Sequence, residues 1–162
     1  MAWGLLSCEG SIYPGSAVVT RARPRPGETS APGANVAAAD MGGRVELVSF
    51  MYGPGFMGRR LIDGLIEPTF QVNGTLAEQA MFPHEIVISF FDRQPATIGS
   101  VVIVLPENVH AAPKDVEIWT SRNYLENGYG KVASSTLEAR PGEQTITFPD
   151  VEAKFVKVRI TS

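Results

Sequence analysis

The sequence contains one cysteine, Cys8, and two histidines, His84 and His110, among its 162 residues. A single cysteine excludes an intrachain disulfide and a metal site built from several cysteines. The two histidines lie in separate segments, and neither belongs to an HExxH pattern or to another metal-binding spacing. A G-x-S-x-G motif is also missing, and no other pattern in the sequence indicates a base, a nucleophile and an oxyanion hole. We therefore expect a protein without catalytic activity.

Concentrated charge and long apolar runs are missing as well. The net charge is −3, and no block of one sign appears anywhere along the chain. Nucleic-acid-binding domains usually carry a basic patch, so we expect no nucleic-acid partner. The longest apolar run is too short to cross a bilayer, so we expect no membrane span. At this length one core can be buried without covalent cross-links.

The sequence is rich in short apolar segments that are separated by turn residues. Val156, Val158 and Ile160 alternate with Lys157 and Arg159, which is typical of a strand with one buried face. Comparable strand patterns occupy residues 44–50, 85–91, 100–105, 115–121 and 144–149. No stretch of a dozen residues has a helical period. The pattern predicts an all-β fold, an antiparallel jelly-roll β-sandwich of about eight strands.

The first part of the chain differs in composition from the rest. Residues 15–34 include Pro24, Pro26, Pro32, Gly27 and Gly33, which suit an extended linker. We therefore expect three parts. Residues 1–14 form an N-terminal strand that closes the sandwich, residues 15–34 form the linker, and residues 35–162 form the sandwich body.

The segment "GPGFMG", residues 53–58, formally matches the G-x-G-x-x-G pattern of dinucleotide sites. That site requires a helix directly after the glycines, because the helix N-terminus holds the pyrophosphate. Gly64 and Pro68 interrupt any helix here. The pattern therefore indicates an exposed loop, in which Tyr52 and Phe56 could contact a ligand.

An ordered set of segments resembles the discoidin-like domains, the coagulation-factor type C group of galactose-binding-like jelly rolls. The segments are NVAAADMGGRVELVSF, RRLIDG, FPHEIVISF, IGSVVIVLP, PKDVEIWTS and VEAKFVKVRI, and they span about residues 35–161. The resemblance implies a non-catalytic module that binds ligands with loops at one end of the sandwich. It also implies an extracellular or cell-surface location, although the start of the chain is not a recognisable signal peptide.

The resemblance further implies a structural calcium ion. The family's calcium loop has an Asp-Gly pair, which "LIDGLIEPTF" supplies as Asp63 and Gly64, with altered spacing to Thr69. Calcium prefers six to eight oxygen ligands, so a second acid is expected. In the family that acid is a glutamate on the last strand, and no such segment follows "FVKVRITS".

The N-terminal segment "WGLLSCEGSIYP" resembles this missing strand, with Glu9 four residues before Tyr13. We therefore predict a circularly permuted domain in which residues 3–13 pair with the strand at 154–161, and Glu9 joins Asp63 at the metal. Pairing within one chain gives a monomer. Exchange of the segment between two copies, which gives a dimer, and a disordered tail are the alternatives.

Two kinds of ligand fit a module of this class. A glycan is bound through aromatic faces and planar polar groups, which the predicted loops offer. The alternative is a partner protein, bound by the same loops or by an open sheet edge. The candidate ligand-binding residues are Tyr52, Phe56, Arg59, Arg60, Asn123 and Tyr124.

Overall fold

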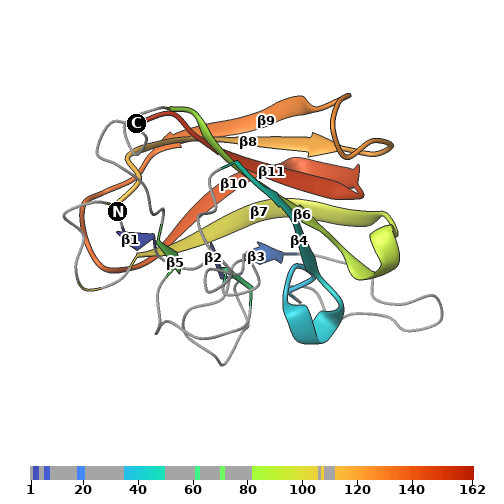
Figure 1. Cartoon of the computed structure of the whole chain (residues 1–162), viewed down its shortest axis with the longest axis horizontal. Coiled ribbons are helices and arrows are strands. Elements are labelled where there is room, and N and C mark those ends of the chain that lie inside the picture. Colours follow the sequence, from blue (N-terminus) through green and yellow to red (C-terminus); the bar gives the residue numbers. More distant parts are fainter. Residues whose placement is uncertain are drawn as a thin grey trace.

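The computed structural model describes residues 2–3, 6–7, 18–20, 35–49, 61–62, 70–71, 82–105, 107 and 112–162. Within these residues the chain forms two main antiparallel sheets (Figure 1). One sheet has five strands in the order β4-β6-β11-β8-β9. The other has four, with β7 between β10 on one side and β2 and β3 on the other. The predicted all-β sandwich is therefore confirmed.

Seven strands of the sandwich have five residues or more. The five-stranded sheet contains β4 (Arg44–Val48), β6 (His84–Ser89), β11 (Phe155–Ile160), β8 (Asp115–Ser121) and β9 (Gly130–Thr136). The long strands of the second sheet are β7 (Ala96–Leu105) and β10 (Gly142–Ala153). Short strands are β1 (Ala2–Trp3), β2 (Leu6–Ser7), β3 (Val18–Thr20) and β5 (Phe70–Gln71), of which β1 and β5 pair with each other.

The hydrophobic core is built by the alternating residues that the strand patterns predicted. Ile118 and Val158 face one another on neighbouring strands and are 0% and 2% exposed. Because side chains alternate between the two faces of a strand, these residues lie on the inner face while Lys157 and Trp119 lie on the outer face. The buried residues include Ile88, Phe90, Val102, Val104, Ile118, Val156 and Val158.

Strand β11 lies inside the five-stranded sheet, with partners on both sides. Val156 pairs with Ile88 of β6 on one side and with Thr120 of β8 on the other. The predicted pairing of residues 3–13 with this strand is therefore wrong. Both of its edges are already occupied, so its backbone groups need no further strand.

The N-terminal residues instead pair with β7 in the other sheet. Leu6 pairs with Ile103, and Ser7 with Val102, within the same chain. Val18, inside the segment predicted as a linker, also pairs with Val102 through β3. The N-terminal piece thus contributes backbone to the sandwich at a different place from the predicted one. The circular permutation stays a prediction, whereas a dimer that pairs these residues with β11 of a second copy would meet the same occupied edges.

Two single 3₁₀ turns lie wholly within the described residues. The first, η1 (Ala39–Met41), precedes β4, and the second, η3 (Phe91–Arg93), follows β6. In that described part, no helix has the length and apolar composition needed to cross a membrane.

Several chain connections meet at one end of the sandwich. Because β11 pairs in register with β6 and β8, its first residue, Phe155, lies level with Ser89 and Ser121, the last residues of those two strands. The chain passes between the two sheets twice at this end, through η3 between β6 and β7 and through Lys154 between β10 and β11. Backbone hydrogen bonds join these connections: Phe90 N donates to Lys154 O at 3.4 Å, and Lys154 N donates to Ser121 O at 2.9 Å.

The turn between η1 and β4 packs tightly against η3. Gly42 has a left-handed backbone with φ of 85°, and a Cβ atom there would overlap the Phe91 ring. A residue with a side chain would therefore be strained by its backbone conformation and would displace the ring. The neighbouring Gly43 is restricted as well, because its Cβ would run into the backbone of Ala37.

We predict that Gly42→Ala lowers the free energy of unfolding by about 1–3 kcal/mol, because the left-handed backbone and the displaced ring both cost stability. Chemical denaturation measures this change. Gly130→Ala is the matched control, since Gly130 lies in β9 and its Cβ would meet nothing within 4 Å. Equal stability of the two variants would contradict the packing of this turn.

Candidate functional site

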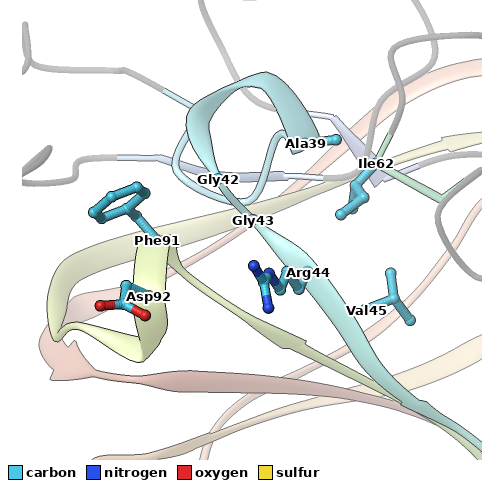
Figure 2. A pocket seen from close by; sticks show the side chains of 8 residues that line it. All are labelled: Ala39, Gly42, Gly43, Arg44, Val45, Ile62, Phe91 and Asp92. Carbon is cyan, nitrogen blue, oxygen red and sulfur yellow. The ribbon is translucent and has the colours of Figure 1, made fainter.

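A cavity of about 540 Å³ opens between η1, the start of β4 and η3. Figure 2 shows Phe91 and Asp92 on one side, with Arg44, Val45 and Ile62 on the other. The backbone of Ala39, Gly42 and Gly43 completes the lining. Ile62 is held there because its carbonyl accepts a hydrogen bond from Ala39 N at 3.0 Å. The cavity therefore lies at the end of the sandwich where the sheet connections gather.

The cavity combines an aromatic ring, a cation and an anion. Phe91 is half-buried, while Arg44 and Asp92 are exposed to solvent. A guanidinium presents several donors in one plane, a carboxylate accepts hydrogen bonds, and an aromatic ring offers an apolar face. Together these groups can pair with the hydroxyls and cover the apolar face of a polyhydroxylated ring.

Asp92 sits in an unusual backbone conformation. Asp92 has φ of 46° and Arg93 has φ of 53°, values that cost residues with side chains roughly 1–3 kcal/mol each. Such strain persists only where surrounding contacts fix the chain, and it is common at binding sites. The local bonds are Arg93 N to Phe90 O at 3.0 Å and Gln94 N to Phe91 O at 2.8 Å.

A charged pair fixes η3 on the outer side of the sheet. Arg93 donates two hydrogen bonds to Glu46, from Nε at 3.0 Å and from Nη2 at 2.8 Å. Ser89 Oγ donates a third to the same carboxylate at 2.7 Å. These donors, Arg93 foremost, hold the pKa of Glu46 below its ordinary value. Glu46 stands at the bulge of β4, where the register shifts between Val45 and Leu47.

The β8–β9 loop, residues 122–129, emerges from the same end of the sheet. Tyr124 at its tip is 62% exposed, which makes it the most exposed large apolar side chain of the described residues. Its backbone N donates a hydrogen bond to Ser121 Oγ at 3.3 Å, which connects the loop backbone to the end of β8. Asn123 is exposed beside it. The structure thus places both predicted residues at the end that holds the cavity.

The rest of this loop folds onto the outer face of the five-stranded sheet. The Tyr129 ring lies 4.4 Å from Lys157 Nζ, and its hydroxyl donates to Leu125 O at 2.9 Å. Burial, and after it the charges of Glu85 and Glu46, raise the pKa of Tyr129. A smaller cavity of about 200 Å³ lies beneath the loop, lined by Tyr129, Lys157 and Trp119 among others.

The polar groups of this smaller cavity bond to one another. Lys157 and Arg159 pair with Glu85 at 3.1 Å and 3.4 Å. Glu117 accepts hydrogen bonds from Trp119 Nε1 at 3.0 Å and from Arg159 Nη1 at 3.1 Å, and these bonds lower its pKa. Because their bonding capacity is used within the chain, we assign these groups to the support of the loop.

Four predicted ligand-binding residues lie outside the described part of the chain: Tyr52, Phe56, Arg59 and Arg60. The predicted metal ligands Asp63 and Glu9 lie outside it too, although Asp63 directly follows Ile62 of the cavity. Within the described ranges, no three His, Cys, Asp or Glu side chains are grouped so that they could hold an ion. The calcium site therefore stays a prediction.

Sequence reasoning missed the residues that line the large cavity, namely Arg44, Phe91 and Asp92. Arg44 and Phe91 were included in predicted strands, where they gave no sign of a ligand role. The signal that could have indicated the site is "FFDRQP" after the buried strand, since an acid and a cation in a short connection suit a turn with exposed polar groups.

Comparison with known proteins relates the fold to carbohydrate-binding modules. No protein-family model matches the sequence, and neither does any curated protein. Among solved structures, the family 32 carbohydrate-binding module of Clostridium perfringens NanJ, in complex with galactose, has a TM-score of 0.61. It is 16% identical, over 74% of this chain and 82% of that one.

Two further structures are similar. The C. perfringens module CpGH89CBM32-5, in complex with GalNAc-β-1,3-galactose, has a TM-score of 0.60 at 15% identity, over 75% of this chain and 85% of that one. Chitosan-binding module 2 from a chitosanase/glucanase of Paenibacillus sp. IK-5, in complex with chitotriose, has a TM-score of 0.62 at 21% identity, over 79% of this chain and 88% of that one. The chain thus has the discoidin-like, galactose-binding-like β-sandwich fold of family 32 modules.

Proposed function

We propose that the protein is a non-catalytic glycan-binding module, and that the cavity between η1 and η3 receives one sugar ring of the ligand. The observation that carries the proposal is the combination of Phe91, Arg44 and Asp92 around a cavity of about 540 Å³ at the loop end of the sandwich. Similar folds in complex with galactose, GalNAc-β-1,3-galactose and chitotriose support it.

The chemistry of the cavity suits an uncharged or weakly charged sugar. Arg44 and Asp92 bring one charge of each sign, so the lining has no strong excess of either. A sugar ring can place neighbouring hydroxyls against the guanidinium and the carboxylate while its apolar face covers Phe91. The fixed Gly42–Gly43 turn and the pair between Arg93 and Glu46 hold this arrangement before a ligand arrives, which limits the entropy lost on binding.

A glycan ligand also fits an extracellular or cell-surface location, which we infer along with the binding function. The solved modules with this fold include one from a family 31 glycoside hydrolase and two from a chitosanase/glucanase. For the present chain we propose the binding role of such a module and no hydrolytic step.

We predict that a glycan array identifies at least one bound glycan, and that Arg44→Ala weakens its affinity by about tenfold to a hundredfold. The expected loss corresponds to hydrogen bonds from a charged donor, about 1.5–3 kcal/mol. Titration calorimetry of the wild type and the variant measures it. Galactose, GalNAc-β-1,3-galactose and chitotriose belong on the array.

Arg140→Ala is the matched control for this titration. Arg140 lies between β9 and β10, at the opposite end of the sandwich, and is exposed. Its removal should leave the affinity unchanged. An array without any bound glycan, together with capture of a defined protein partner, would favour the protein-interaction role. Equal losses from both arginine variants would contradict the cavity as the binding site.

The resemblance also leads us to propose calcium as a structural ion, held by Asp63 with Glu9. We predict that calcium raises the melting temperature of the protein and that Asp63→Asn removes this increase, because the loop loses a charged oxygen ligand. Thermal melts with calcium and with a chelator measure the effect. An unchanged melting temperature in chelator would show that no calcium is bound and that Asp63 is a turn residue only.

A further inference from the structure

We propose that the glycan site extends across the end of the sheet to Tyr124, so that the protein selects oligosaccharides over single sugars. This inference rests on the proposed glycan-binding function. In it, the cavity beside Phe91 holds one end of the ligand, and the Tyr124 ring stacks on a more distant sugar. The structural basis is that β4, β6, β11 and β8 lie in one sheet and that each begins or ends at the same level.

The sheet sets the distance between the two parts of the site. Arg44 pairs with Ser89, Ser89 with Phe155, and Phe155 with Ser121, so the four residues form one row. Neighbouring strands are about 4.8 Å apart, which puts Ser121 roughly 14 Å from Arg44 along the row. That separation exceeds one pyranose ring. A ligand that touches both the cavity and the β8–β9 loop must therefore be an oligosaccharide.

Polar groups lie between the two parts of the proposed site. Backbone hydrogen bonds connect Phe90, Lys154 and Ser121 across it. Arg122, which directly follows β8, forms an ion pair with Glu152 of β10. The side chains of Arg122 and Glu152 are 67% and 47% exposed, so they are available to the hydroxyls of a ligand that crosses the rim.

Tyr124 is held in an exposed position by its own loop. Its backbone N donates to Ser121 Oγ, and Ser121 Oγ donates to Asn127 O at 3.4 Å. A Cβ placed on Gly128 would lie 3.6 Å from Tyr124 Cδ2, so the ring stands beside this glycine. Gly128 has φ of 71°, which lets the loop turn back there. An exposed aromatic ring on a loop whose backbone is held in this way can cover a sugar face.

The test uses an array that contains β-linked oligomers of glucosamine, N-acetylglucosamine and galactose, each as a series from the single sugar to the tetramer. For the series that binds, we expect the wild-type affinity to rise with length. Tyr124→Ala should reduce the affinity for the longer members by about tenfold and leave the shortest member unchanged, because only long ligands reach the ring.

Two further variants separate the ring from other effects. Tyr124→Phe should keep the preference for long ligands, since the ring face remains. Leu47→Ala removes the other exposed large apolar side chain of the described residues, which lies in β4 opposite Val87, and should change nothing. Binding that is independent of length and of Tyr124 would overturn the extended site while leaving the proposed function intact. Failure of every glycan to bind would instead overturn the proposed function.

Discussion

The in-register pairing of β11 with both β6 and β8 is the constraint on which the proposed binding end of the molecule depends. It brings Ser89, Phe155 and Ser121 to one level, so that the connections after β6, before β11 and after β8 emerge together. A sandwich with a slipped β11 would turn its apolar face to solvent, because side chains alternate with a period of two. Core burial therefore also fixes where the connections that form the proposed binding site emerge.

Two connections at this end, η3 and the β8–β9 loop, are supported by charged groups on the outer face of the same sheet. Glu46 and Arg93 hold η3, and Lys157 holds Tyr129 of the β8–β9 loop. Lys157 is in turn paired with Glu85. The charged outer face therefore supports the end of the sandwich where we propose that the ligand binds.

The sequence predicted the sandwich and the core, because alternation reports which face of a strand is buried. It did not predict which strands are neighbours. The alternation in "FVKVRI" would be the same in an edge strand as in the interior position that β11 occupies. Strand β9 was missed, since a bulge opposite Ile118 and Trp119 interrupts the alternation. The cavity was missed because Arg44 and Phe91 come together only when the turn at Gly42 packs against η3.

The most direct test is a nuclear magnetic resonance titration of isotope-labelled protein with the glycan that the array identifies. If the end of the sandwich is the binding site, backbone amide shifts should concentrate at Gly42, Gly43, Phe91 and Asp92. The amides of Arg140 and Gly142 at the opposite end should stay unchanged. Shifts confined to that opposite end, or to Trp119 on the outer face, would contradict the proposed site.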